Sequence, residues 1–277
     1  MTQQPGKLWV VATPIGNLDD LSPRARSALA GADLIAAEDT RHSAALLQHA
    51  GIATRCVALH EHNERDISAG LVERLSAGAS IALICDAGTP LISDPGFRLV
   101  RAARAAGVVV SPVPGACAAI AALSVAGLPS DRFVFEGFLP PKSAARRTRL
   151  QALRVETRTL IFYESSHRIV AALDDLVAEF GGERRAVVAR ELTKLFETVL
   201  DGALADLAAR VVADPNQQRG EFVVLVAGAD EDATAARLAE GRRVFDLLRE
   251  ELPPGRAAKL AAAISGASRK QLYNAGD

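Results

Sequence analysis

The chain has 277 residues, of which 49% are hydrophobic and 23% are charged, and its formal net charge is −1 at pH 7. These values are typical of a soluble globular protein and exclude disorder of the whole chain. A net charge near zero provides no overall basic field, so a nucleic-acid partner would have to be bound by a local patch.

The same sequence favours a reduced, cytoplasmic setting. Its three cysteines are far apart and show no CxxC or Cys/His spacing, which argues against disulfides and predicts no metal site. The N-terminal apolar run is too short for a signal peptide, and no uninterrupted stretch of about 18 apolar residues is present. We therefore expect a cytoplasmic protein without a membrane partner.

The first half of the chain alternates between short apolar runs and helical spacing. The predicted strands are residues 8–13, 32–38, 55–60, 80–85 and 107–113. Several are apolar throughout, as expected of strands covered on both faces, and residues 64–77 between them have helical periodicity. This pattern predicts an α/β domain with a mainly parallel sheet.

The alternation resumes after Gly127 and Pro129. Here the predicted strands are residues 132–139, 158–164, 185–190 and 220–228, and the predicted helices are 165–180 and 203–213. The fold class is therefore α/β, with domains at 1–126 and 127–232 and a ligand cleft expected between them.

Residues 233–277 are predicted to form a small C-terminal helical tail. One amphipathic helix covers 237–252, and the stretch 253–274 divides at Gly266 into two helices. A helix, a tight glycine turn and a helix are typical of a helix-turn-helix, although a three-helix cap or a dimerisation element fits as well. Four cations favour a nucleic-acid contact: Arg256, Lys259, Arg269 and Lys270.

The stretch "LICDAGTPLISDPG" (83–96) places a loop of small residues after a buried strand. Asp94 is the predicted N-cap of the next helix and Pro95 its first residue. The loop then lies at the carboxyl end of a parallel strand, where open α/β sheets bind ligands. No GxxxxGK[ST] or GxGxxG occurs in the chain, which argues against nucleoside triphosphates and ordinary dinucleotides.

Small residues dominate this loop and two others. Ala87, Gly88 and Thr89 would expose backbone groups to a ligand that carries its own amine and carboxylate, although a turn without a ligand is the alternative. Similar loops follow the strands at 8–13 and 107–113, the second of them with Ala116, Cys117 and Ala118. Three such loops together indicate a ligand cleft.

Eight motifs occur in a fixed order along the chain. They are "VATPIGNL", "AEDTRHS", "HEHNE", "CDAGTPLISDPG", "PVPGACAA", "GFLPPK", "YESSHR" and "ARELTKLFE". Through these motifs the chain resembles the ribosomal RNA small-subunit methyltransferase I family of the tetrapyrrole methylase superfamily, from about residue 8 to about 228. The tail is also similar to the family's, whereas Ser166 stands where the family generally has proline.

The resemblance implies a homodimeric, two-domain enzyme that uses S-adenosylmethionine. It also implies methylation of the ribose 2′-OH of one cytidine in the decoding region of 16S rRNA, presented as RNA or as the small ribosomal subunit. S-adenosylmethionine has an amino-acid moiety and no phosphate, which agrees with loops that lack a phosphate-binding lysine. By motif, the residues expected against the cofactor are Pro14, Ala87, Gly88, Thr89, Ile92, Ala116, Cys117 and Ala118, with Phe162, Tyr163 and Glu164 near its adenosine. For Cys117 a small buried hydrophobic side chain is the alternative.

A ribose 2′-OH is a poor nucleophile, so a base or a charge near the developing alkoxide should help methyl transfer. Asp39, Arg41 and His62 are the catalytic candidates because they follow two predicted strands. The alternatives are an N-cap with a surface ion pair for the first two, and a surface histidine for the third.

Residues expected to bind the substrate come from both halves of the chain. They are Asn63, Lys142, Arg146, Arg147, Arg168, Glu191 and Lys194. Lys142 begins a cationic cluster that is the predicted RNA-phosphate patch, although solvated helix charge explains the arginines as well. Two rival functions remain: methylation of a tetrapyrrole carbon, and a non-catalytic nucleic-acid-binding protein that uses residues 253–274.

Overall fold

The computed structural model describes residues 6–229 and 231–274, and the side chains of 231–234 are left out of the description. Backbone contacts divide the chain into two compact units, residues 1–122 with 191–197 and residues 123–190 with 198–277. The division falls four residues before the expected boundary at 126/127, and it assigns the short segment 191–197 to the first unit. None of the helices in the described ranges is long and apolar enough to cross a bilayer.

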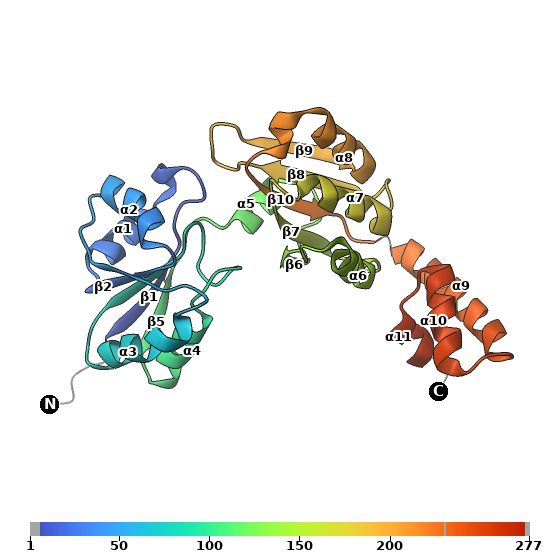
Figure 1. Ribbon diagram of the computed structural model, residues 1–277, viewed down its shortest axis with the longest axis horizontal. Coiled ribbons are helices and arrows are strands. Elements are labelled where there is room, and N and C mark those ends of the chain that lie inside the picture. The colour runs from blue at the N-terminus through green and yellow to red at the C-terminus, as the bar shows by residue number, and fades with distance from the viewer. Residues whose placement is uncertain (1–5, 230, 275–277) are drawn as a thin grey trace. The chain divides into compact units, whose positions relative to one another are not determined.

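The first unit is a five-stranded parallel sheet with strand order β3-β2-β4-β1-β5 (Figure 1). Its strands are β1 (Lys7–Val11), β2 (Leu34–Ala37), β3 (Cys56–Ala58), β4 (Ile81–Ile84) and β5 (Val109–Val113). Its helices are α1 (Pro23–Ala30), α2 (Thr40–His49), α3 (Glu64–Ser76) and α4 (Phe97–Ala105), and α5 (Ala118–Val125) continues into the second unit. The predicted parallel sheet is confirmed.

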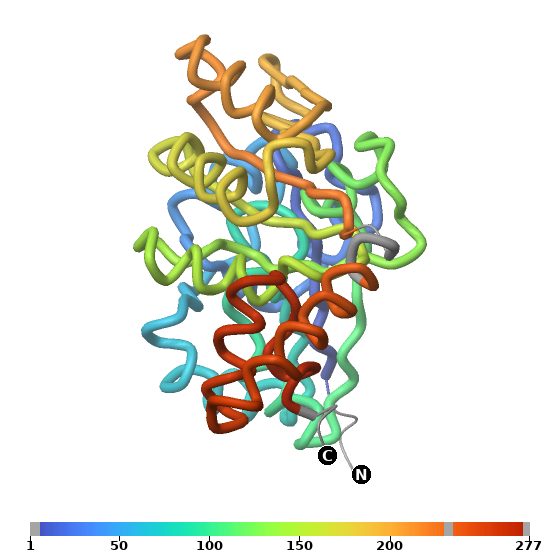
Figure 2. Tube along the Cα trace, turned by 90° about the vertical axis from the view of Figure 1, so that its right-hand side faces the viewer, coloured from blue at the N-terminus to red at the C-terminus, as the bar shows by residue number. Residues whose placement is uncertain are grey.

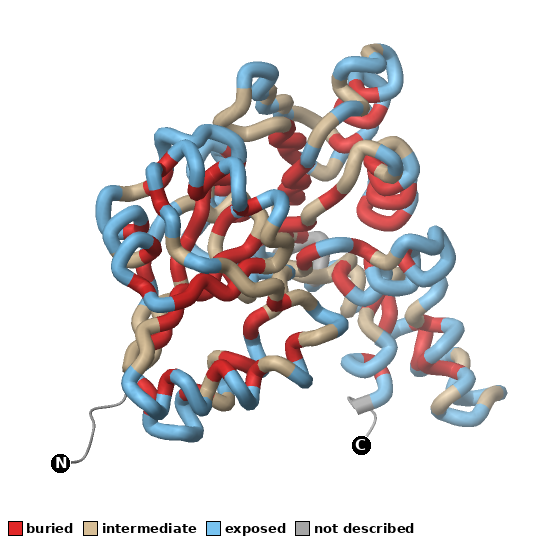
Figure 3. The backbone as a smooth tube through the Cα atoms, turned by 60° about the vertical axis from the view of Figure 1, so that its left-hand side comes forward, coloured by how far each residue is buried: buried red, intermediate tan, exposed pale blue. Residues whose placement is uncertain are grey.

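The central strands β2 and β4 are buried on both faces, whereas the edge strand β5 is partly exposed. Alternate residues of the strands point to opposite faces, so β2 packs Ile35 and Ala37 with α1 and α2 but Leu34 and Ala36 with α3 and α4. The strands therefore lie inside the unit while the outer faces of the helices remain exposed (Figure 3). Burial on both faces explains why these strands are apolar without alternation.

The second unit contains a mixed sheet with strand order β6-β7-β10-β8-β9. Its strands are β6 (Phe133–Phe138), β7 (Thr159–Ser165), β8 (Arg185–Arg190), β9 (Thr198–Ala203) and β10 (Glu221–Val226), and its helices are α6 (Ser143–Leu153), α7 (Ile169–Phe180) and α8 (Leu204–Ala213). Only β6 and β7 are parallel, and the other pairs are antiparallel. Strand β9 was not predicted, because it is a half-exposed edge strand interrupted by Gly202.

The tail forms three helices, α9 (Glu231–Arg249), α10 (Pro254–Ser265) and α11 (Arg269–Asn274), which pack beside one another (Figure 2). The predicted division at Gly266 is confirmed, since this residue ends α10 in the left-handed conformation with φ of +71°. Gly241 of α9 lets the helices approach, because a Cβ there would lie 2.7 Å from the Ser265 hydroxyl and 2.8 Å from Ala267 Cβ.

The predicted start of the helix after the "DAGTP" loop is wrong. Helix α4 begins at Phe97 with Gly96 at the cap position, not at Asp94 and Pro95. The buried carboxylate of Glu64 takes over the capping role, accepting hydrogen bonds at Oε1 from the backbone N–H of Gly96 (3.1 Å) and two residues of the first turn. A charged acceptor on another helix satisfies these donors better than a local side chain would, which leaves the loop free to extend.

Candidate functional site

The five loops that follow the strands of the first sheet lie at the carboxyl-terminal end of that sheet, which is called the carboxyl edge below. Because all five strands are parallel, their carboxyl ends point the same way. The edge therefore carries, from β3 to β5, the "HEHNE", "AEDTRHS", "CDAGTP", "ATPIGN" and "PVPGAC" segments. The site residues predicted in the first 118 residues therefore all lie in loops at the same end of the sheet.

Three of these loops are hydrogen-bonded directly to one another. Thr13 N–H donates to the Gly88 carbonyl (2.8 Å), and Gly88 N–H donates back to the Thr13 carbonyl (3.1 Å). The Thr89 hydroxyl donates to the Ala116 carbonyl at 2.9 Å. The loops after β1, β4 and β5 therefore form one connected backbone surface.

Glycine permits this close approach at two positions. Gly88 has φ of +84°, and a Cβ on it would lie 3.3 Å from Ile15 Cγ2. A Cβ on Gly115 would lie 2.9 Å from Ala12 Cβ. Side chains at these positions would force the loops apart or fill the space between them.

Two acidic side chains connect the loops after β2 and β4. The carboxylate of Glu38 accepts from Asp86 N–H (3.4 Å), and the carboxylate of Asp86 accepts from Asp39 N–H (3.1 Å). Burial raises the pKa of Glu38. Glu38 and Asp86 were not among the predicted site residues, although a carboxylate directly after each of two buried strands was a usable signal.

Cys85 and Asp94 lie beneath the "DAGTP" loop. The Cys85 thiol donates to the carbonyls of Ala87 (3.3 Å) and Gly88 (3.5 Å). Burial, together with the neighbouring Asp94, raises the pKa of this thiol, so it stays protonated and serves as a donor. Burial also raises the pKa of Asp94 to about 6.

Because the folded-state pKa of Asp94 lies above its usual value of 3.8, folding favours the protonated form. The contribution of Asp94 to the stability of the wild-type protein should therefore be lost as pH rises from about 4 to about 6, and Asp94→Asn removes this contribution. We expect the variant to gain about 1 kcal/mol in unfolding free energy relative to wild type across this window, after allowing for solvent screening. Urea unfolding at both ends of the window measures the difference, with the exposed Asp131→Asn as control. A difference in unfolding free energy between Asp94→Asn and wild type that does not change with pH would contradict the expectation.

Asp39 and Arg41 form an ion pair at the start of α2. Asp39 is the N-cap, and it accepts from Arg41 N–H at 2.8 Å and from the Arg41 guanidinium at 3.0 Å. The hydrogen bonds from Arg41 lower the pKa of Asp39 to about 2. A carboxylate that binds protons so weakly is a poor general base at neutral pH, whereas Arg41, with 90% of its side chain exposed, is accessible to a ligand.

In the "HEHNE" segment, Asn63 shapes the backbone and His62 faces solvent. Asn63 Oδ1 accepts from His60 N–H (2.9 Å), and Asn63 Nδ2 donates to the Ala58 carbonyl (3.1 Å). Both polar ends of this predicted substrate-binding residue are therefore occupied within its own turn. The His62 ring is exposed, and its centroid lies 6.0 Å from that of His60.

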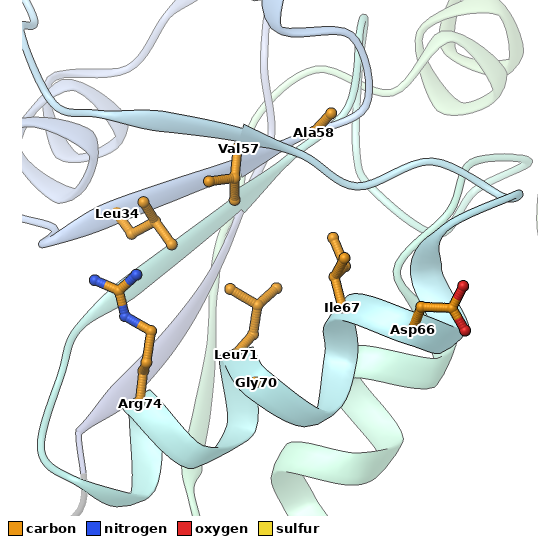
Figure 4. Close-up of a pocket in the computed structure, with 8 residues that line it drawn as sticks. All are labelled: Leu34, Val57, Ala58, Asp66, Ile67, Gly70, Leu71 and Arg74. Atoms are coloured by element: carbon orange, nitrogen blue, oxygen red, sulfur yellow. The ribbon is translucent and has the colours of Figure 1, made fainter.

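A hollow of about 340 Å³ lies between α3 and the strands β2 and β3 (Figure 4). It is lined by Leu34, Val57, Ala58, Asp66, Ile67, Gly70, Leu71 and Arg74. None of the predicted site residues lines it, and its wall is mostly aliphatic. We assign the site to the loops at the carboxyl edge and not to this hollow.

The predicted RNA-phosphate patch on α6 needs a correction. Arg146 is 3% exposed, and its Nε bonds the Asp175 carboxylate at 2.7 Å, so it supports the fold and is not available to a phosphate. Arg147 is paired with Glu179 at 2.6 Å, which leaves only its exposed half for a ligand. Lys142 precedes α6 and is exposed, so it remains available for phosphate binding.

The three residues expected near adenosine are placed differently from one another. Phe162 is 1% exposed and its side chain belongs to the core of the second unit, which favours a packing role for this residue. Glu164 is also buried, and it bonds Arg168 at 2.8 Å. Tyr163 is half-buried, with its ring edge-to-face against Phe135 at 4.9 Å.

Glu191 and Lys194, predicted to bind substrate, lie in the segment that belongs to the first unit. They form an ion pair of 2.8 Å, and the Lys194 side chain packs against Gly16 in the loop after β1. Glu191 and Thr193 have positive φ values of 50° and 67°, which are costly for residues with a Cβ. Sequence alone did not indicate this placement beside the β1 loop.

Within the described residues, no group of three or more His, Cys, Asp or Glu side chains is placed to hold a metal ion.

The family model for tetrapyrrole (corrin/porphyrin) methylases matches residues 7–208, and the model for the RsmI C-terminal HTH domain matches residues 235–276. The ribosomal RNA small subunit methyltransferase I of Xylella fastidiosa (strain Temecula1) is 62% identical over 97% of this chain and 98% of its own length. The chain belongs to the ribosomal RNA small subunit methyltransferase I family.

Further comparisons agree with this membership. The ribosomal RNA small subunit methyltransferase I of Pseudomonas aeruginosa is 60% identical over 97% of this chain and 95% of its own length. A structure of uroporphyrin-III C-methyl transferase from Thermus thermophilus complexed with S-adenyl homocysteine has a TM-score of 0.55 at 18% identity, covering 80% of this chain and 97% of that one. This likeness shows the tetrapyrrole methylase fold, and the family resemblance seen in the sequence motifs is confirmed.

Proposed function

We propose that this member of the ribosomal RNA small subunit methyltransferase I family transfers a methyl group from S-adenosylmethionine to a ribose. The acceptor is the 2′-OH of a specific cytidine in the decoding region of 16S rRNA, within the cytoplasm. The observation that carries the proposal is the connected edge of small-residue loops after β1, β4 and β5. The names of the similar proteins support rRNA as the substrate, and the complex of the Thermus protein supports the cofactor.

The residues at this edge fit an adenosyl amino acid. Among the described residues no partner is assigned to the backbone N–H of Ala87 or Thr89, and Ala87 and Ile92 are exposed beside them. Ala116, Cys117 and Ala118 are half-buried, as residues lining a cofactor would be. These short side chains leave backbone donors and acceptors accessible to an amine and a carboxylate. Pro14, in the loop after β1, is buried and would lie at the bottom of the cofactor site.

S-adenosylmethionine, when bound, supplies a methyl group that its sulfonium already activates toward displacement. The loops hold donor and acceptor in line, and alignment of this kind can supply a large part of a rate enhancement. Their hydrogen bonds to one another fix the alignment before the substrate arrives.

Arg41 and His62 act on the acceptor in this proposal. The ionised Asp39 orients Arg41. Arg41 binds a phosphate next to the reacting ribose or stabilises the negative charge that develops on the 2′-oxygen. His62 is exposed at the same edge and accepts the 2′-OH proton directly or through one water. Asp39 is then a positioning residue for Arg41.

The RNA contacts away from this edge come from Lys142, from the exposed part of Arg147 and from the helix-turn-helix-like tail. Arg168, Glu191 and Lys194 position the nucleotide through their ion pairs. We propose a homodimer as the active assembly. Two copies double the number of local cationic contacts on a chain whose net charge is only −1.

Labelled S-adenosylmethionine and small ribosomal subunits from a strain without this protein test the proposal. We expect label on one cytidine ribose of 16S rRNA, and little of it with Arg41→Gln or His62→Gln. Naked 16S rRNA in a parallel reaction shows whether the assembled particle is required. Transfer to a free tetrapyrrole instead of RNA would establish the rival activity, and no transfer to either acceptor would overturn the proposal.

A further inference from the structure

Three arginines gather at one place in the second unit. They are Arg154 at the end of α6, Arg184 in the turn before β8, and Arg237 on α9 of the tail. In the described part of the chain none of the three is bonded to a carboxylate, whereas Arg146, Arg147 and Arg149 of α6 each have one. Like charges without counter-charges repel, so the cluster needs an explanation other than stability.

Arg184 is held in a fixed orientation. Its guanidinium donates to the Ala227 carbonyl (3.2 Å) and to the Arg154 carbonyl (3.1 Å). The guanidinium carbon also lies 5.6 Å from the centroid of the Phe180 ring. Burial and the charges of Arg237 and Arg154 lower the pKa of Arg184.

Arg154 and Arg237 each have a buried N–H group without a hydrogen-bond acceptor among the described residues. The groups are Arg154 Nε and one terminal nitrogen of Arg237. The turn that ends α10 lies beside the Arg154 guanidinium, because a Cβ on Gly266 would lie 3.5 Å from the Arg154 Cζ. Buried donors without acceptors are rare in folded proteins and mark a place where a ligand can supply the acceptors.

The chemistry of the missing acceptor follows from these donors. Guanidinium groups bind phosphate oxygens through paired N–H donors, and one phosphodiester would both occupy the free donors and offset the repulsion. We propose that Arg154, Arg184 and Arg237 bind a backbone phosphate of the RNA substrate between the second sheet and the helical tail. This inference rests on the proposed function, and it gives the tail a specific role in holding RNA.

Arg237→Gln separates this role from a structural one. Without RNA, removal of one of three repelling charges should leave the melting temperature unchanged or raise it. With a short RNA that contains the decoding-region cytidine, we expect Kd to rise about 3- to 10-fold, and the slope of log Kd against log salt to fall by about 0.7 to 0.9. Affinity for S-adenosylmethionine should not change. Arg243→Gln, on the same helix but paired with Glu240 at 2.8 Å, is the matched control and should change none of these values.

The outcomes distinguish the inference from the proposed function. Unchanged RNA affinity and salt slope in Arg237→Gln, with wild-type methyl transfer to rRNA intact, would overturn the inference alone. A lower melting temperature without RNA would show a structural role and also overturn it. Inorganic phosphate is added as a separate probe: stabilisation of wild type by phosphate, with RNA affinity unaffected by the substitution, would assign the cluster to a free anion and not to RNA. Failure of wild type to methylate rRNA would count against the proposed function.

Discussion

Replacement of Gly88 by leucine is expected to weaken binding of S-adenosylmethionine by at least about 100-fold, which corresponds to roughly 2.7 kcal/mol. The glycine has φ of +84°, and its missing Cβ would point between Ile15 and the Ala116 carbonyl. A leucine side chain would therefore fill the space that the loops leave for the ligand. Isothermal titration calorimetry measures the affinity, and circular dichroism shows whether the variant remains folded.

Backbone strain has to be separated from blockage of the site, because any residue with a Cβ is strained at positive φ. Gly107→Leu provides the matched control: Gly107 has φ of +74°, no atom lies within 4 Å of its missing Cβ, and it precedes β5 at the opposite edge of the sheet. We expect this control to lose some stability and to keep its affinity. Wild-type affinity in Gly88→Leu would show that the loop is only a turn.

The second large effect is expected at Arg146. Arg146→Met should destabilise the second unit by about 3–5 kcal/mol, because it leaves the carboxylate of Asp175 buried without its partner. In a protein of this size the melting temperature should fall by roughly 10 °C. Differential scanning calorimetry measures the change, and the RNA affinity of the folded variant should stay near that of wild type.

Arg185→Met is the control for this substitution. Arg185 lies on β8 of the same unit and pairs with Asp201 at 3.8 Å, and more than half of each side chain is exposed. Exposed ion pairs contribute about 0–1 kcal/mol, so its melting temperature should change little. Equal shifts in the two variants would contradict the structural role of Arg146, and lost RNA affinity at unchanged stability would restore its predicted role in phosphate binding.

Local patterns were sufficient to predict the first sheet and to place its small-residue loops at one end of it. The strands are apolar because both faces are covered, and parallel strands necessarily bring their carboxyl ends to one edge. The small-residue loops at 86–92 and 114–118 could therefore be placed at the same end of the sheet from the sequence. Gly266 ended α10 where predicted for a similarly local reason, its left-handed conformation.

The wrong predictions concern residues whose local structure or burial depends on a partner distant in sequence. Asp94 has the properties of an N-cap, but Glu64 on another helix provides the acceptor that α4 uses. Arg146 belongs to a cationic run, but Asp175 on α7 neutralises it in the interior. Charge is visible in a sequence, whereas the identity of the counter-charge depends on tertiary packing.

The hydrogen bonds that join the loops at the carboxyl edge also constrain how this enzyme can change. A substitution in the segment after β4 alters the position of the segments after β1 and β5, because Thr13, Gly88, Thr89 and Ala116 share their hydrogen bonds. Effects of substitutions in contacting groups are not additive. Directed evolution toward another methyl donor should therefore succeed through substitutions combined across loops, and libraries that vary one position at a time should return mostly inactive variants.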